Sequence, residues 1–455
     1  MYSPVRDLIS GAIMAATSVP QLIAYAETVG YAGYIGMSTA GPPLLAWGLV
    51  TGSPYMNAGV TSITALMAKS DLDGESYVQE YGEEKYIQLV AAYSMYVGIA
   101  SVALAVLGFG KLAALVPKPV RTGFKWGCSV GVLLSALPNG LFAKGSKELK
   151  SLVAESDLFG SLVVQLKTQV PAATGAVNVA GFFYALSHPM DWAVIPAILF
   201  IVGTWFVMDG KKYLPTFLPP GTEVIIFTGL ATLYSMNFDY EGGVVGEIPA
   251  MDPNAGFEIA GYRVPIEFLD YQKILDAPVA ERMGGVPILA ISATLFAAVN
   301  FLSIMGIASG FESENGIAWS APRELIAQGV SCGVAAIVGS APVSGSMSRS
   351  LVSRMTGTTS QLACMLTAII WITMLPYMSI MTPTPKAALS SVIVSAVVKG
   401  IVRPKDLMKA TGLDFVIGWL TGIITACTSP TIGFGAGLVI YLVFYPFRSS
   451  KSKTD

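Results

Sequence analysis

The chain has 455 residues, of which 53% are hydrophobic and 12% are charged. Roughly a quarter of the residues of a soluble domain are charged, so this composition excludes a fully water-exposed surface and indicates a protein of the lipid bilayer. The formal net charge of −2 excludes a bulk electrostatic attraction to nucleic acid.

Apolar stretches predict fourteen helices, because a helix satisfies its own backbone hydrogen bonds in lipid. About 20 apolar residues cross a hydrocarbon core of about 30 Å. In chain order, we expect the helices at 9–27, 35–52, 57–68, 87–107, 120–141, 191–208, 221–236, 286–310, 322–339, 343–355, 361–381, 385–401, 412–428 and 430–447. The sequence therefore predicts an all-α polytopic membrane protein, with a transmembrane domain over 1–447 and a short basic cytosolic tail at 448–455.

An even number of spans places both termini on the same side of the membrane. Basic residues between the predicted helices collect on that side: Lys111, Lys118, Arg121, Lys211, Lys212, Arg403, Lys405 and Lys409. Acidic residues follow the third helix on the opposite side: Asp71, Asp73, Glu75, Glu80, Glu83 and Glu84. By the positive-inside rule we expect a multi-pass protein of the plasma membrane with both termini in the cytosol.

Two of the expected helices, 57–68 and 343–355, are too short to span a bilayer. Each is the third helix of its half of the chain, the halves being about 9–236 and about 286–447. Short, glycine-interrupted segments at matching positions of two halves are typical of inverted-repeat transporters with a binding site near the bilayer midplane. The pattern predicts a seven-plus-seven inverted repeat.

The stretch VSGSMSRSLVSRMTG at 343–357 places Ser346, Ser348 and Arg349 in the second short helix. A helix that begins inside the membrane has unpaired backbone N–H groups and a partial positive charge at its N-terminus, which attract an anion. Serine and glycine alone would also suit plain helix packing. Arginine favours the anion site, because a guanidinium at membrane depth is costly and marks a functional site or a paired charge.

Three segments resemble the SulP family, the sulfate permease and anion exchanger group. Residues 323–363 resemble its ninth and tenth helices, and residues 384–401 resemble its twelfth. Residues 18–67 are similar to its first three helices, with a proline-glutamine start, an alanine-aromatic-alanine turn and a glycine before the third helix. The resemblance covers both halves of the chain at corresponding places.

This resemblance implies a core domain and a gate domain, with the anion held between the third and tenth helices. It carries over six substrate-binding residues: Gln21, Tyr25, Thr61, Ser346, Ser348 and Arg349. Their chemistry fits, since amide, phenol and hydroxyl groups donate hydrogen bonds and the guanidinium supplies positive field. Tyr25 could alternatively be a core packing residue with no contact to the anion.

The sequence departs from the family pattern in three ways. Val60 stands where the family usually has a proline, and Ser303 stands where proton-coupled members have a helix-eight carboxylate. Glu27 is a possible substitute for that coupling group, although a solvated helix end also explains it. Family members typically carry a cytosolic STAS domain after the last helix, whereas this sequence has none after residue 447, so either the domain is absent or the sequence is a fragment.

The expected function is secondary transport of a small oxyanion, with sulfate as the first candidate. The missing carboxylate favours an alternative on the same scaffold, an uncoupled chloride/bicarbonate exchanger or channel. An enzyme is disfavoured, because His188 is the only histidine and no metal-ligand cluster or nucleophile-base pair accompanies it. A nucleotide-driven pump is disfavoured, because no P-loop occurs. Four cysteines without CxxC spacing indicate no metal site, and no cofactor is implied. Expected partners are the anion, the lipid bilayer and a second copy of the chain as a homodimer.

Overall fold

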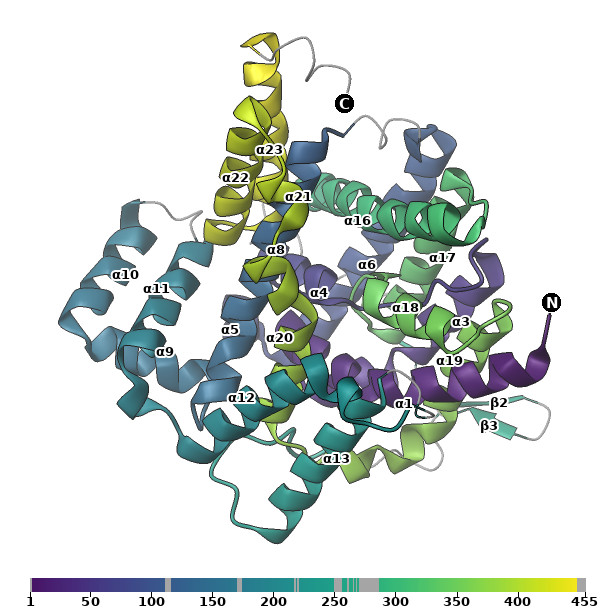
Figure 1. The fold of residues 1–455 in the computed structure, drawn as a ribbon, viewed down its shortest axis with the longest axis horizontal. Helices are drawn as coiled ribbons and strands as arrows, with labels where there is room; N and C mark the ends of the chain where they lie inside the picture. The colour runs from purple at the N-terminus through teal and green to yellow at the C-terminus, as the bar shows by residue number, and fades with distance from the viewer. Residues whose placement is uncertain are drawn as a thin grey trace. The chain divides into compact units, whose positions relative to one another are not determined.

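The structure is a computed structural model that describes residues 2–110, 116–169, 174–216, 218, 221–248, 256–259, 262–264, 266, 268–269 and 286–447. The predicted tail at 448–455 lies outside these residues. Helices make up most of the described secondary structure (Figure 1), and the strands form two short antiparallel pairs, β1 with β4 and β2 with β3. The prediction of an all-α protein is confirmed.

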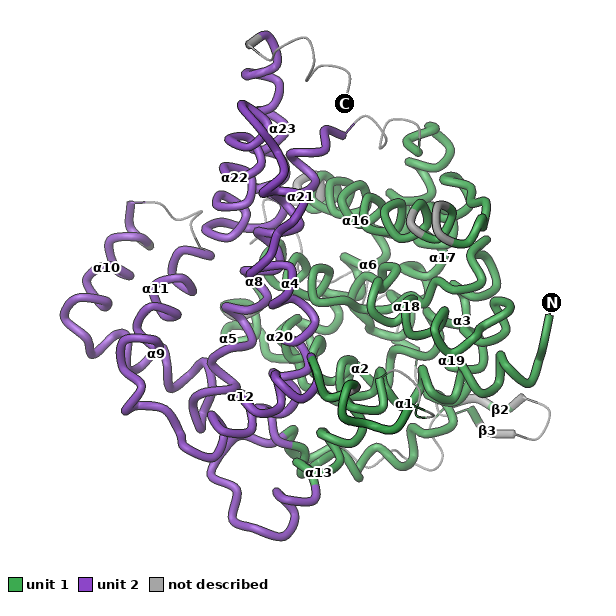
Figure 2. Tube along the Cα trace, viewed as in Figure 1, with its two compact units in different colours: residues 1–114, 209–232, 245–384 green, residues 115–208, 233–244, 385–455 purple. Residues whose placement is uncertain are grey.

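The chain divides into two compact units, each built from both halves of the sequence (Figure 2). Unit 1 comprises 1–114, 209–232 and 245–384, and unit 2 comprises 115–208, 233–244 and 385–455. All the predicted site residues belong to unit 1.

Unit 1 holds most of α13 and all of the following elements: α1 (Pro4–Val29), α2 (Gly33–Ser38), α3 (Gly41–Val50), β1 (Ala58–Gly59), α4 (Ser62–Asp71), α5 (Gly74–Tyr81), α6 (Glu83–Val106), η2 (Gly210–Lys212), β2 (Phe257–Ile259), β3 (Tyr262–Val264), α16 (Val286–Asn315), α17 (Ala321–Val338), β4 (Ser344–Gly345), α18 (Met347–Met355), α19 (Leu362–Met374) and η3 (Leu375–Met381). The α13 helix spans Thr222–Asn237. Unit 2 holds these elements: α8 (Lys118–Leu141), α9 (Ser146–Glu155), α10 (Asp157–Gln169), α11 (Thr174–Ser187), η1 (Pro189–Asp191), α12 (Val194–Asp209, almost entirely), α20 (Lys386–Val402), α21 (Lys405–Met408), α22 (Gly412–Cys427), α23 (Pro430–Phe444) and η4 (Tyr445–Phe447).

Several described helices have the length and composition of membrane spans. Among the described residues, five helices are each long and apolar enough to cross a membrane: α1, α6, Leu289–Ser309 of α16, Leu362–Met381 and Lys386–Met408. The α8 and α9 helices meet at 91° and supply a sixth span if they are counted as one. The apolar helices α12, α22 and α23 have 15 or 16 residues, so they are shorter than a standard span.

Three helices between Leu141 and Val194, namely α9, α10 and α11, were not predicted from the sequence. The α9 sequence SKELKSLVAE is too charged to pass a test for membrane spans, and α11 has only 14 residues. Both are helical nevertheless, since a short amphipathic helix needs an apolar stripe rather than a continuous apolar run.

In unit 1, α19 lies along α1 through hydrogen bonds to the α1 backbone. Trp371 Nε1 donates to the Ala15 carbonyl at 3.0 Å, and Thr367 Oγ1 donates to the Gly11 carbonyl at 3.1 Å. Such side-chain bonds to a neighbouring helix take the place of water in a buried interface. They hold α1, which carries Gln21 and Tyr25, in a fixed position within unit 1.

In unit 2, glycines allow α8 and α22 to approach closely. A Cβ atom on Gly123 would collide with the Gly418 carbonyl, and one on Gly127 would lie 2.6 Å from Cβ of Thr425. Small residues at a helix crossing give close van der Waals packing in a membrane, where there is little hydrophobic drive to associate.

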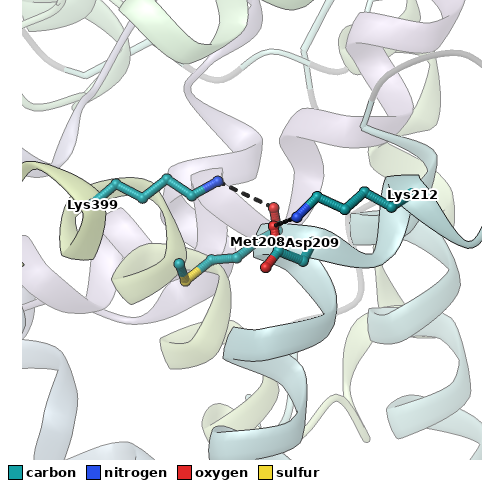
Figure 3. A network of polar contacts seen from close by, with 4 residues as sticks. All are labelled: Met208, Asp209, Lys212 and Lys399. Carbon is teal, nitrogen blue, oxygen red and sulfur yellow. Dashed lines mark hydrogen bonds and ion pairs between the residues drawn. The ribbon is translucent and has the colours of Figure 1, made fainter.

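The end of α12 carries two lysine contacts (Figure 3). Lys399 Nζ donates to the Met208 carbonyl at 3.2 Å, and Lys212 Nζ lies 2.8 Å from Asp209 Oδ1. The hydrogen bond and the charge of Asp209 raise the pKa of Lys212. Because Lys212 is exposed, this ion pair contributes little to stability.

Candidate functional site

The two short helices begin later than predicted. The α4 helix starts at Ser62 rather than residue 57, and α18 starts at Met347 rather than residue 343. The residues before them are extended and pair as strands, with Ala58 opposite Gly345 and Gly59 opposite Ser344. Glycine disfavours the helix, and the strand pair satisfies backbone groups that no water would reach.

The strand pair brings the N-terminal ends of α4 and α18 side by side. Next to it, the Ser346 N–H donates to the Asn57 carbonyl at 2.9 Å, and the Asn57 N–H donates to Ser350 Oγ at 3.0 Å. Three contiguous residues on one side, 57–59, thus meet four on the other, 344–346 and Ser350, through main-chain or main-chain to hydroxyl bonds. Two helix ends of partial positive charge therefore face the same small region.

The two helix ends are capped differently. Thr61 is the N-cap of α4, where it accepts a hydrogen bond from the Thr64 N–H at 3.3 Å in a reciprocal capping box. Ser346 is the N-cap of α18, but its hydroxyl accepts no hydrogen bond from a backbone N–H of that helix and instead bonds to the Ser348 hydroxyl of the first turn, at 3.3 Å. The first turn of α18 therefore keeps N–H donors that its cap does not occupy.

Arg349 lies across the start of α4. Its side chain is only 2% exposed, and Nη2 donates to the Val60 carbonyl at 3.0 Å. Nε and Nη1 have no hydrogen-bond partner among the described residues. A Cβ atom on Gly59 would lie 2.9 Å from both Nη atoms, so the guanidinium occupies the space that the glycine leaves.

Gln21 and Tyr25 approach from α1, one helical turn apart and hence on the same face. Tyr25 is buried, and its phenol lies near the Ser62 hydroxyl and the Arg349 guanidinium. Gln21 is half-buried, and its Oε1 has no hydrogen-bond partner in the described part of the chain. The structure thus places the six predicted substrate-binding residues on α1 and at the starts of α4 and α18, and α1 packs against both of these short helices.

The two predicted coupling residues lie in different places. Ser303 is half-buried on α16, one turn after Asn300, whose Nδ2 donates to the Val343 carbonyl at 2.9 Å. This contact places that face of α16 against β4. Glu27 lies further along α1, with Oε1 3.6 Å from the position of a Cβ atom on Gly33 at the start of α2.

Sequence reasoning missed the residues that support the site from outside the short helices. Asn57 and Ser350 bond across the strand pair, and Val60, which replaces the family's proline, supplies the carbonyl that accepts from Arg349. The sequence signal that could have revealed the strand pair is a short run of small and polar residues before each short helix, NAG at 57–59 and SGS at 344–346. Within the described residues, no cluster of His, Cys, Asp and Glu could hold a metal ion.

The comparisons with known proteins decide the family. A family profile, that of the sulfate permease family, matches residues 5–421. The chain belongs to this family. The resemblance predicted from the sequence is confirmed, and so is the assignment to a family of transporters rather than of enzymes.

Curated relatives are similar over nearly the whole chain. Solute carrier family 26 member 6 of Homo sapiens is 25% identical over 462 residues, which cover 97% of this chain and 55% of that protein. Sulfate transporter 4.1, chloroplastic, of Arabidopsis thaliana is 24% identical over 461 residues, which cover 98% and 58%. The chain spans a little more than half the length of these relatives.

Solved structures are similar in fold. The structure of SLC26A9 has a TM-score of 0.75 at 18% identity and covers 97% of this chain and 65% of its own. The transmembrane domain of the cyanobacterium bicarbonate transporter BicA has a TM-score of 0.69 at 16% identity and covers 96% and 98%. The predicted seven-plus-seven inverted repeat is confirmed.

Proposed function

We propose that this chain is a secondary carrier that moves a small oxyanion, sulfate, across the plasma membrane by alternating access. Arg349 is the observation that carries the proposal: a guanidinium with 2% of its surface exposed and two atoms that have no partner among the described residues. Removing a charge from water without a partner costs several kcal/mol, on the order estimated for buried ions. A bound anion would offset that cost.

The proposed site suits a tetrahedral oxyanion. Two helix N-termini and the Arg349 donors provide positive potential and N–H groups, which are the usual partners of sulfate and phosphate oxygens. Ser346, Ser348 and Thr61 add hydroxyl donors, and the Gln21 amide adds another from α1. Tyr25 forms an aromatic wall with a phenolic donor.

A second candidate is an uncoupled chloride/bicarbonate exchanger or channel. Ser303, in place of a carboxylate on α16, favours this function because serine cannot carry a titrating charge. Among the similar proteins, an "Anion exchange transporter" of Homo sapiens is 22% identical, and BicA is named a bicarbonate transporter. We also propose that both termini are cytosolic and that the chain forms a homodimer.

Uptake of labelled sulfate into proteoliposomes tests the proposal. We expect saturable uptake that unlabelled sulfate suppresses and that chloride or bicarbonate suppresses only at much higher concentration. Vesicles preloaded with chloride or bicarbonate serve to detect exchange. Labelled chloride that enters faster than sulfate under the same gradients would favour the second candidate, and the absence of any anion flux would overturn both.

A further inference from the structure

A second polar cluster, in which Tyr93 is buried and Asp71 and Ser292 are half-buried, lies at the other end of α4 from the proposed anion site. Asp71, the last residue of α4, accepts two hydrogen bonds at Oδ2, from Tyr93 Oη on α6 at 2.6 Å and from Ser292 Oγ on α16 at 2.8 Å. The two hydroxyls lie 3.3 Å apart. Neither the proposed anion site nor the capping of α4 accounts for this carboxylate.

The cluster lies among helices that have the length and composition of membrane spans. Tyr93 is fully buried and lies ten residues after the start of α6, or about 15 Å along the helix. Ser292 falls within the span of α16. Asp71 is half-buried and accepts hydrogen bonds from residues of both spans, and an ionisable side chain set against membrane spans indicates an ion or proton pathway.

The elements around Asp71 differ in the charged and titratable groups that they carry. Residues 86–106 of α6 and 286–311 of α16 contain no charged residue in their sequence, and these two helices contribute the Tyr93 phenol and the Ser292 hydroxyl to the cluster. Near Asp71 on its own chain segment, Lys69 lies within α4 and Asp73 follows it. The α5 helix adds the exposed Glu80 and the buried Tyr77 phenol.

The carboxylate and the helix end repel each other. The C-terminus of a helix carries about half a negative charge, so a charged Asp71 adds to an unfavourable potential there. The two hydroxyl donors counter this repulsion while the carboxylate is charged. Protonation removes the charge and leaves a neutral acid that needs less support from these donors.

We propose that Asp71 is a proton-binding site that couples proton binding to anion binding at Arg349. The ten-residue α4 helix separates the two sites by about 15 Å. A negative charge at Asp71 lowers the potential at the anion site. With an effective dielectric constant of about 20, its removal strengthens anion binding about sixfold.

The step is a simple protonation. Asp71 carboxylate takes a proton from water at its end of unit 1 and becomes the neutral acid, and no other bond forms or breaks. By linkage, a bound anion strengthens proton binding by the same factor that the proton strengthens anion binding. This inference rests on the proposed function and supplies a titrating group in place of the carboxylate that Ser303 lacks.

Sulfate uptake by Asp71→Asn, measured between pH 5 and pH 8 in proteoliposomes, tests the proposal. For the unmodified protein we expect the apparent KM to fall about sixfold as the pH falls, since protonation removes the negative charge. Asp71→Asn keeps the size of the side chain and mimics the neutral acid. Its KM should be low and independent of pH.

Asp73→Asn is the matched control, because it removes the same charge two residues away at an exposed position. Its pH profile should match that of the unmodified protein. Ser292→Ala removes one donor to the charged carboxylate, so the midpoint of the profile should move to higher pH.

A merely structural Asp71 would give a different result, because loss of a support would raise KM at every pH. That outcome, or an Asp71→Asn profile that keeps the original pH dependence, overturns the proposal. So does an unmodified protein whose KM does not change with pH. In each case sulfate uptake itself would stand, whereas failure of the proposed function would abolish uptake in all variants.

Discussion

Arg349 combines three features in one side chain: a fixed positive charge, deep burial and a hydrogen bond to the backbone of the opposite helix start. The bond to the Val60 carbonyl uses one nitrogen and leaves two. A guanidinium is planar and presents its donors in a fixed fork, so one edge can hold the protein while the other faces an anion.

Replacing the charge at this position gives the first prediction. Arg349→Gln should keep a polar side chain of similar length but lose a charge-assisted hydrogen bond of about 1.5–3 kcal/mol. We expect the apparent affinity for sulfate to fall roughly tenfold to hundredfold. Uptake kinetics in proteoliposomes, with folding checked by size-exclusion chromatography in detergent, measure this loss.

Two further variants at the same site separate the contributions. Arg349→Lys should recover part of the affinity if field alone matters, and little if the fork makes directed contacts. Ser348→Ala should weaken binding less than Arg349→Gln, since it removes one neutral donor among several. An unchanged affinity in Arg349→Gln would make the arginine structural.

Gly59 leads to the second prediction. A Cβ atom there would lie 2.9 Å from both Nη atoms of Arg349, which is closer than side chains normally approach. Gly59→Ala should displace the guanidinium and weaken sulfate affinity, with the maximal rate reduced less than the affinity. Gly306→Ala on α16 is the control, because nothing lies within 4 Å of its Cβ position. Equal kinetics for the two variants would contradict the role given to Gly59.

At this scale the sequence indicated Arg349 as a candidate site residue but not the residues that bond around it. Arg349 was proposed because an arginine in a short apolar segment is unusual, whatever the fold. Asn57 and Asp71 were not, because an asparagine near a helix start and an aspartate in an acidic loop are ordinary in sequence. Only the pairing of β1 with β4 and the packing of α6 and α16 reveal their partners.

At the scale of elements, the position of the two short helices was predicted and their first residues were not. Periodicity and length identify a helix but cannot detect a pairing between residues almost 290 positions apart, as for Ala58 and Gly345. The same limit explains the absence of α9, α10 and α11 from the prediction. A membrane span is recognised in a sequence as a long apolar run, whereas these helices are short or contain charged residues.

The contact between α8 and α22 gives the third prediction. Gly123→Ala should force the helices apart, because its Cβ would collide with the Gly418 carbonyl. Overpacking of this kind costs about 1–3 kcal/mol. A thermal-shift measurement in detergent should therefore show a lower Tm for this variant.

Gly400→Ala is the matched control for that variant. Gly400 is exposed on α20 with nothing within 4 Å of its Cβ position. Alanine favours the helix by up to about 1 kcal/mol relative to glycine, so its Tm should be unchanged or slightly higher. A Gly123→Ala protein as stable as Gly400→Ala would show that the close approach of α8 and α22 is not required.

For the whole molecule, composition was sufficient to predict a polytopic helical protein, and the paired short segments were sufficient to predict the repeat. The partition into two units was expected only from the family resemblance, because no composition shift marks the boundaries at 114, 208 or 384. Each unit draws on distant segments, which a reading along the chain does not reveal.

The topology gives the fourth prediction. With both termini cytosolic, Gln79→Cys on α5 should react with a membrane-impermeant maleimide on intact cells. Lys405→Cys on α21 should react only after permeabilisation. Both positions are exposed. Labelling of the native cysteines should be low, because Cys128, Cys332 and Cys364 are buried, and both variants are made in a Cys427→Ser background to remove the half-buried fourth cysteine. The reverse labelling pattern would invert the proposed orientation.

The pairing of β1 with β4 limits how the anion can be released. Because the starts of α4 and α18 share main-chain hydrogen bonds, neither helix can swing away from the other without breaking them. The space between the two helix starts therefore cannot open by separation of α4 from α18 while these bonds are intact. In the transport cycle that we propose, the anion therefore stays between the same two helix ends throughout, and α4 and α18 move together with it.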